Sequence, residues 1–163
     1  MYEIIKRRRS VRVFLPNAIS REDLNKILDA GRLAPSANNL QQWEFVVVDD
    51  KDLRLALSDL CQWGRFIKTA PVTIAVFGDR QNSSTPLDCA AATENMIIMA
   101  SALNIASCWV AGYRKPHSES IRKLLSVPRN YELVSLIVLG YSDADVKMPD
   151  KRSLESVTHF NKF

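Results

Sequence analysis

Four residues near the start of the chain, Arg8, Arg9, Ser10 and Arg12, have side chains that bind phosphate well. A guanidinium group donates paired hydrogen bonds to phosphate oxygens, and a neighbouring hydroxyl adds one more donor. The segment therefore suggests a phosphate site. A solvated basic end of a short helix is the alternative, because cations near a helix C-terminus are stabilised by the helix dipole. These residues alone leave both interpretations open.

A second segment with chemical potential runs from Pro35 to Trp43 and contains a serine and several amide side chains. Such groups can hydrogen-bond the edge of a flat heteroaromatic ring, which carries many donors and acceptors. A polar connecting loop is the alternative. The third segment, Ser107 to Gly112, ends in small residues, which allow a ligand to approach the backbone closely.

The composition excludes several other kinds of site. Three widely spaced cysteines, Cys61, Cys89 and Cys108, and only two histidines form no zinc motif, so we expect buried, reduced thiols. The net charge of +4 is too small to indicate a nucleic-acid partner by itself. The basic cluster also lacks the interleaved aromatic residues of a nucleic-acid-binding surface. A nucleic-acid-binding module is therefore a remote alternative, and we expect no such partner.

A membrane location is not expected either. The N-terminus lacks the apolar core of a signal peptide, so the predicted location is the cytoplasm. The uncharged stretch from Asn95 to Tyr113 only just reaches the length of a membrane span, and polar residues interrupt it. A helix that is apolar on most faces is more often a core or interface helix.

The elements that must position these segments follow from periodicity and turn signals. Helices are predicted over Glu3–Arg8, from a Ser20 cap to Leu33, from an Asp49-Asp50 cap to Leu60, over Thr85–Leu103 and over Pro116–Leu125. Strands are predicted over Trp43–Val48, Ala70–Gly78, Ser107–Val110 and Leu133–Gly140. Strands that are apolar on both faces and alternate with helices indicate an α/β or α+β domain over residues 1–163, with a sheet covered on both sides. The strand order stays open.

The motifs occur in an order that resembles the nitroreductase family. Arg-Arg-Ser-x-Arg is followed by Ala-Pro-Ser-x-x-x-x-Gln-x-Trp, which begins at Ala34. Further similar segments are Ala70-Pro71-Val72, Ser107 to Gly112, Ile121 to Pro128 and Val138 to Tyr141. The resemblance extends from Met1 to about Val157.

This resemblance implies an α+β fold with a central, mostly antiparallel sheet flanked by helices, in an interlocked homodimer with FMN at the interface. Arg8, Arg9, Ser10 and Arg12 would then hold the phosphate, the ribityl chain and the pyrimidine edge of FMN. The implied contacts from the other protomer are Pro35, Ser36, Ala37, Asn39 and Gln41. The implied contacts with the flavin ring are Val110, Ala111 and Gly112. Lys151 or Arg152 would close on the phosphate, and the segment Asn95–Leu103 would lie between protomers.

The implied activity is hydride transfer from NAD(P)H through flavin N5 to an electron-poor acceptor such as a nitroaromatic or quinone, in a ping-pong cycle. No side chain is predicted to be catalytic, because the cofactor carries the chemistry. A flavin carrier or a flavin-fragmenting member of the family is the alternative.

Three departures from the family pattern stand out. Ala37 stands where the family often has a serine, and Gln42 stands where it has a proline. Trp63 replaces a common asparagine. Its indole could stack on a substrate or fill the core, and the sequence leaves both possibilities open.

Overall fold

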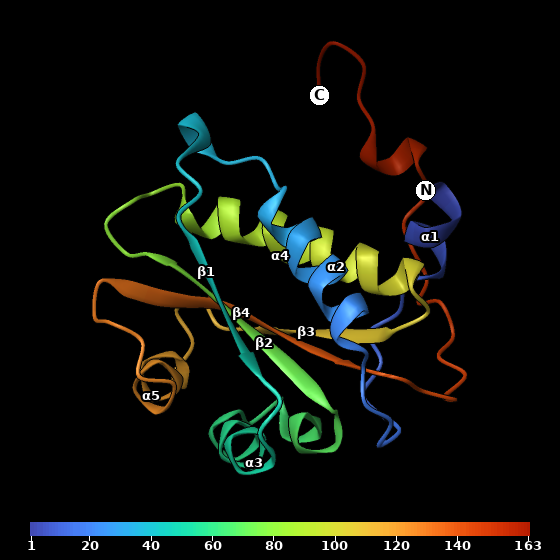
Figure 1. Ribbon diagram of the computed structural model, residues 1–163. Coiled ribbons are helices and arrows are strands. Elements are labelled where there is room, and N and C mark those ends of the chain that lie inside the picture. Colours follow the sequence, from blue (N-terminus) through green and yellow to red (C-terminus); the bar gives the residue numbers. More distant parts are fainter.

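The computed structural model describes residues 1–163 and shows a four-stranded sheet with helices on both faces (Figure 1). The strands are β1 (Trp43–Val48), β2 (Val72–Asp79), β3 (Ala106–Ala111) and β4 (Tyr131–Gly140). They lie in the order β1-β2-β4-β3, and every neighbouring pair is antiparallel. The α+β class and the antiparallel sheet are thus confirmed, and β3 forms one edge of the sheet.

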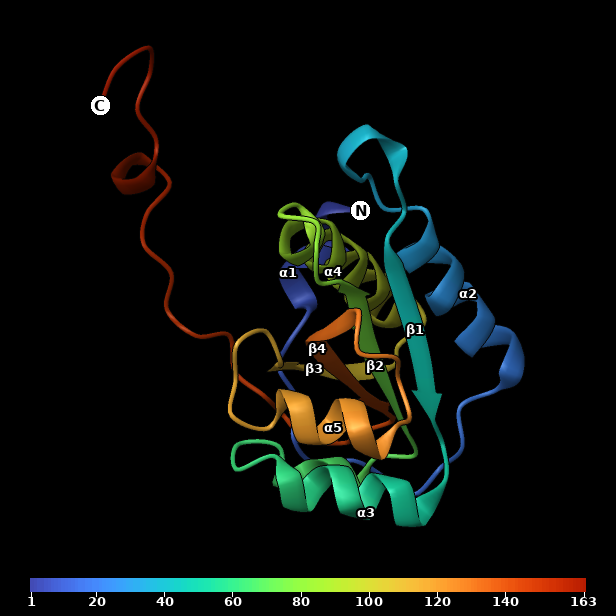
Figure 2. The same cartoon turned by 90° about the vertical axis from the view of Figure 1, so that its left-hand side faces the viewer.

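The helices divide between the two faces of the sheet, as Figures 1 and 2 show. One face carries α1 (Tyr2–Arg7), α2 (Arg21–Arg32) and α4 (Thr85–Ala102), and the other carries α3 (Lys51–Leu60) and α5 (Ser118–Leu124). Each predicted helix is present within about two residues of its expected ends. Short 3-10 turns occur at Ala37–Asn39, Arg65–Thr69 and Glu155–Val157, and the sequence pattern did not predict them.

Helix starts follow the local signals in the sequence. The Ser20 hydroxyl accepts a hydrogen bond from the Asp23 amide at 3.0 Å, and the Asp50 carboxylate accepts one from the Leu53 amide at 2.8 Å. Each side chain satisfies an amide that the first helical turn leaves without a backbone partner. Both predicted caps are therefore confirmed.

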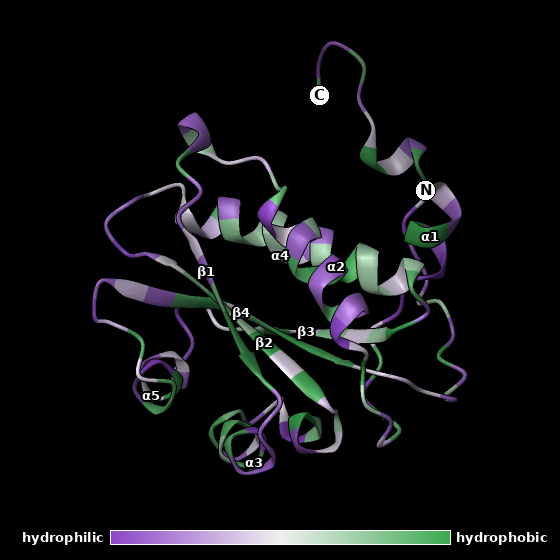
Figure 3. Ribbon diagram, viewed as in Figure 1, coloured by the Kyte–Doolittle hydropathy of each residue, from purple (hydrophilic) through white to green (hydrophobic).

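Helix α4 lies between the sheet and α2, which accounts for much of its lack of a polar face (Figure 3). Met96, Ile97 and Ala100 are buried within this one chain. Interface burial is therefore not needed to explain most of the apolar residues that the sequence placed between protomers. Ile98 and Met99 remain half-buried at the surface.

All three cysteines are free and buried, as predicted. Burial raises the pKa of the Cys61 thiol to about 11 and that of the Cys89 thiol to about 12. Thiolate is the reactive form of cysteine, so these two side chains behave as small apolar core residues.

One ion-pair network joins α5 to the end of β2 and should make stability depend on pH. Glu119 accepts hydrogen bonds from the buried Arg122 at 2.7 and 3.0 Å and also faces Arg80. The bonds from Arg122 lower the pKa of Glu119 to about 2. A carboxylate whose pKa is lower in the folded state stabilises the fold above its unfolded pKa of about 4.3, and this contribution is lost as pH falls toward 2.

We therefore expect Glu119→Gln to be less stable than the parent at pH 7, with the difference nearly gone at about pH 2. Urea unfolding across this pH range measures the effect. Glu94→Gln, which removes a carboxylate without an ion pair, is the matched control. A Glu119→Gln deficit that stayed constant from pH 7 to pH 2 would contradict the assignment.

Candidate functional site

The arginine-rich N-terminal segment lies along the free edge of β3. The Val11 amide donates to the Ser107 carbonyl at 2.9 Å, and Ser10 forms an isolated parallel bridge with Ser107. Val11 and Phe14 are buried in the core and anchor the segment in this position. The structure thus brings together two of the three segments that the sequence singled out.

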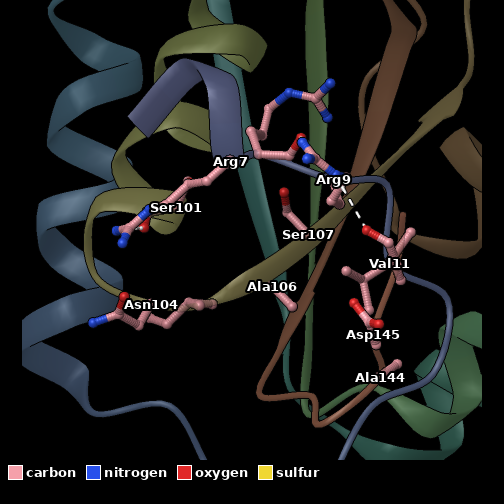
Figure 4. Close-up of a pocket in the computed structure, with 12 residues that line it drawn as sticks. Arg7, Arg9, Val11, Ser101, Asn104, Ala106, Ser107, Ala144 and Asp145 are labelled. Carbon is pink, nitrogen blue, oxygen red and sulfur yellow. Dashed lines mark hydrogen bonds between the residues drawn. The ribbon is translucent and has the colours of Figure 1, made fainter. Parts of the chain in front are cut away.

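Arg8 and Arg9 line a groove of about 330 Å³ together with Arg7. Figure 4 shows Arg7 and Arg9 on this groove. Arg7 donates to the Ser101 carbonyl, and Arg9 turns the other way and donates to the Val146 carbonyl at 3.2 Å. The last turn of α4 and the chain that follows β4 therefore hold the groove in shape.

The positive charge of this segment is not neutralised within the chain. No carboxylate lies within 4.0 Å of the guanidinium of Arg7, Arg8, Arg9 or Arg12. Asp145 also lines the groove but stays outside that distance. Clustered arginines without counter-ions are the donor set that phosphate prefers.

Arg12 does not line the groove of Arg8 and Arg9. Its guanidinium carbon lies 5.9 Å from the centre of the Phe66 ring, and its Nη1 donates to the Ser10 carbonyl at 3.3 Å. Burial raises the pKa of the Cys108 thiol, and the charges of Arg12 and Arg8 oppose that rise. Both guanidiniums therefore act on the same short stretch of β3.

The end of β3 presents a free backbone donor at the edge of the sheet. The Gly112 amide donates to the Val134 carbonyl at 3.0 Å, so Ala111 and Ser135 face each other in a non-hydrogen-bonded pair. The N–H and C=O of Ala111 consequently point away from β4. The carbonyl bonds with His117 Nε2 at 2.9 Å, whereas the N–H has no neighbouring strand.

Close packing against β4 leaves no room for a side chain at Gly112. A Cβ atom there would lie 2.6 Å from Leu133 Cγ and 3.1 Å from the backbone carbon of Val134. The sequence argument attributed the small residue to the close approach of a ligand. Contact with the neighbouring strand is sufficient to explain it.

Hydrogen bonds within the segment and to α4 hold the segment from Ala34 to Gln42 in place. The Ala37 amide donates to both oxygens of Asp88, each at 3.2 Å, and the Gln41 amide donates to the Ser36 hydroxyl at 3.0 Å. Asn38, Asn39 and Gln41 have positive φ angles of 51°, 56° and 50°. Backbone held in this sparsely populated region is common at functional sites.

This loop, which includes Pro35, does not meet the arginines within one chain. It projects beside the N-terminal end of α4 (Figure 1) and contributes no residue to the groove of Arg8 and Arg9. Sequence reasoning did not identify Asp88 of α4 as the anchor of this loop.

Lys151 and Arg152 lie on a C-terminal tail that leads away from the sheet (Figure 2). Both are exposed, and Arg152 donates to the Ser156 carbonyl in the same tail. Neither lines the groove. Their predicted contact with a phosphate therefore stays a prediction.

Trp63 does not fill the core, because its side chain is 81% exposed. It lines a pocket of about 530 Å³ beside Val110 and Ala111. The possibility that the indole fills the core is therefore wrong, and stacking on a substrate stays a prediction. Lys115 and His117 line the same pocket, and sequence reasoning did not single them out although they follow Gly112 by only three and five positions.

The structure contains neither a cluster of metal-binding side chains nor a helix suited to cross a membrane. No group of three or more histidine, cysteine, aspartate or glutamate side chains is placed to hold a metal ion. None of the helices combines the length and apolarity needed to span a membrane.

Comparison with known proteins agrees with the fold and with the order of the motifs. A protein of Archaeoglobus fulgidus, provisionally named NADH dehydrogenase/NAD(P)H nitroreductase, is 39% identical over 145 residues, which are 85% of this chain and 83% of that protein. The structure of an FMN-dependent nitroreductase from Clostridium difficile R20291 superposes with a TM-score of 0.95 at 34% identity and covers 100% of both chains.

A protein of Methanothermobacter thermautotrophicus that carries the same provisional name is 32% identical over 163 residues, 94% of this chain and 85% of that protein. Residues 5–64 and 60–141 match the Nitroreductase family. The resemblance inferred from six short motifs is confirmed, and the chain belongs to the Nitroreductase family.

Proposed function

We propose that this protein is an FMN-dependent oxidoreductase that takes hydride from NAD(P)H and reduces an electron-poor acceptor, a nitroaromatic or a quinone, in a ping-pong cycle. The observation that carries the proposal is the set of unneutralised arginines beside the free edge of β3. The names of the relatives from Archaeoglobus fulgidus and Clostridium difficile support it.

The residues at this edge fit FMN by their chemistry. Arg8, Arg9 and Ser10 would hold the phosphate and the ribityl chain, since both arginines line the groove and Ser10 pairs through its backbone with Ser107, which also lines it. Arg12, outside that groove, would lie at the pyrimidine edge. The segment Val110–Gly112 would lie against the ring, where the free N–H of Ala111 is a donor for a ring nitrogen.

When bound, FMN supplies the redox chemistry, as flavins accept and pass on hydride. For a nitro acceptor the overall balance is one nitro group, one NAD(P)H and one proton giving one nitroso group, NAD(P)⁺ and water. Arg12 would place positive charge where negative charge develops during reduction. No side chain at the β3 edge is compelled to act as an acid or base, so solvent supplies the proton.

The site is complete only when a second copy contributes the loop Pro35–Gln41. Ser36, Ala37, Asn39 and Gln41 carry the amide, hydroxyl and backbone groups that would reach the flavin, yet they lie away from the arginines of their own chain. The proposed assembly is therefore a homodimer. Lys151 or Arg152 on the projecting tail would add the last phosphate contact.

The visible spectrum of the purified protein, before and after anaerobic addition of NADH or NADPH, tests the proposal. Flavin absorbance that bleaches with the nicotinamide and returns with a nitroaromatic or quinone supports it. Bound flavin that neither nicotinamide bleaches would favour a carrier, and irreversible loss of the flavin chromophore would favour a flavin-fragmenting enzyme. A protein without flavin affinity that binds DNA in a salt-dependent way would overturn it.

The cysteines should be dispensable for this activity. Cys108 is buried beneath the β3 edge and the pKa of its thiol is raised, so reactive thiolate is scarce. Cys108→Ser should keep both its FMN and its rate of reduction by NAD(P)H, as stopped-flow spectroscopy can measure. Cys108→Ala separates loss of the thiol from the cost of a buried hydroxyl. If both variants hold FMN but lose reduction, the thiol takes part in the reaction.

A further inference from the structure

The pocket beside Trp63 is a distinct feature at the end of β3. It lies between the chain that follows α3, the last residues of β3 and the turn that precedes α5, and its volume is about 530 Å³. Pockets that hold small ligands have volumes of about 300–1,000 Å³. Val110 and Ala111 line it, so a ligand in this pocket lies against the same strand end that we assign to the flavin ring.

The charge that faces the pocket is positive. Lys115 is its one charged lining residue, and no aspartate or glutamate lines it. Lys115 has no carboxylate within 4.0 Å. The nearest acid in the sequence, Glu119, is held by Arg122 and Arg80, so its charge is already paired.

His117 is oriented by the strand end. A carbonyl oxygen can only accept, so the 2.9 Å contact between His117 Nε2 and the Ala111 carbonyl means that Nε2 carries the proton. This hydrogen bond fixes the imidazole over the end of β3. The pocket therefore combines one oriented polar ring with one exposed, unpaired cation.

Trp63 adds a large flat apolar surface. An indole that is 81% exposed and borders a pocket can stack on an aromatic ring, and such pairing is favourable beyond the area that it buries. A neutral aromatic would use this surface alone. An aromatic that carries an anionic group would also use Lys115.

We propose that this pocket selects aromatic acceptors that bear a carboxylate, with Trp63 against the ring and Lys115 paired with the carboxylate. The inference rests on the proposed function and deepens it, because it names the class of acceptor. The pocket shares Val110 and Ala111 with the flavin site, so it holds the acceptor next to bound FMN.

Equilibrium dialysis of the oxidised, FMN-loaded protein against 4-nitrobenzoate and methyl 4-nitrobenzoate tests the inference without turnover. The carboxylate should bind about two- to fivefold more tightly than the ester, the order of effect of a charge pair that includes an exposed lysine. Lys115→Gln should abolish this preference. Trp63→Ala should weaken the binding of both probes and leave their ratio unchanged.

Lys123→Gln, which removes a lysine of α5 that does not line the pocket, is the matched control and should keep the preference. The ratio of kcat/KM for the two probes should follow the binding ratio in all variants. An unchanged preference in Lys115→Gln, or no binding of either probe, overturns the inference while NAD(P)H-dependent bleaching still supports the proposed function. Release of FMN by the probe also overturns it, because the pocket would then belong to the flavin itself.

Discussion

FMN should bind this protein far more tightly than riboflavin, and replacing Arg8 by alanine should remove most of the difference. Riboflavin lacks the phosphate, and Arg8 lines a groove in which no carboxylate pairs with the arginines. A charge-assisted hydrogen bond contributes about 1.5–3 kcal/mol, so Arg8→Ala should weaken FMN binding by that amount. The affinity for riboflavin should hardly change.

Replacing Arg12 by alanine should affect flavin binding in a complementary way. It lies over Phe66 and outside the groove, so it should act on the ring portion that FMN and riboflavin share. Arg12→Ala should therefore weaken both flavins by about 1.5–3 kcal/mol.

Fluorescence titration of the flavin-free protein with each flavin measures both effects. Arg129→Ala, which removes an exposed arginine away from the groove, is the control. Equal affinity of the parent for FMN and riboflavin would show that the protein has no phosphate site.

Most elements of this fold could be predicted from the sequence because their signals are local. The unbroken apolar run Leu133–Gly140 indicated a strand buried on both faces, and β4 is in fact a central strand. The order β1-β2-β4-β3 had no local signal, since strand pairing joins segments far apart in the chain. The turn at Arg65–Thr69 was missed because a short 3-10 turn has too few residues to show a periodicity.

The same difference between local and long-range signals decided which residues of the candidate site could be predicted. Arg8 and Arg12 were recognisable by residue type and spacing, but the contact between Ala37 and Asp88 joins residues 51 positions apart and was not. The exposure of Trp63 also depends on tertiary structure, because an indole can fill a core or lie at the surface and its neighbours in the sequence do not decide between the two. Lys115 and His117 became candidates for ligand contacts only in the structure, in which they line the same pocket as Trp63 and the end of β3.

A charge placed on the apolar groove between α1, α2 and α4 should lower dimer content and flavin content together. This groove has a volume of about 420 Å³ and is lined by Ile4, Leu33, Ile98, Met99 and Ala102, among others. Leu33 is 64% exposed in the isolated chain. An exposed apolar groove of this kind suits the interface of the proposed homodimer. Lys26 also lines it but is already paired with Glu22 and Asp23, so a carboxylate placed there would be desolvated without a free partner.

Met99→Glu is the direct test, although Met99 lines neither the groove of Arg8 and Arg9 nor the pocket beside Trp63. If Pro35–Gln41 of one copy complete the site of the other, a ligand that binds only the dimer stabilises the dimer by mass action, and loss of the dimer releases the ligand. Sedimentation velocity and the flavin-to-protein absorbance ratio can be measured on one sample. Both should fall in parallel.

Two further variants separate this effect from unfolding. Met99 also packs partly on the core, whereas Leu33→Lys changes an exposed residue at the end of α2 and should leave the fold of the protomer intact while still disrupting the dimer. Leu55→Glu places a carboxylate, as Met99→Glu does, but on the exposed face of α3, across the sheet from the groove. It should change neither the dimer content nor the flavin content. A folded monomer of Leu33→Lys that retained full FMN would show that one chain holds the whole site, and the shared-site proposal would then be wrong.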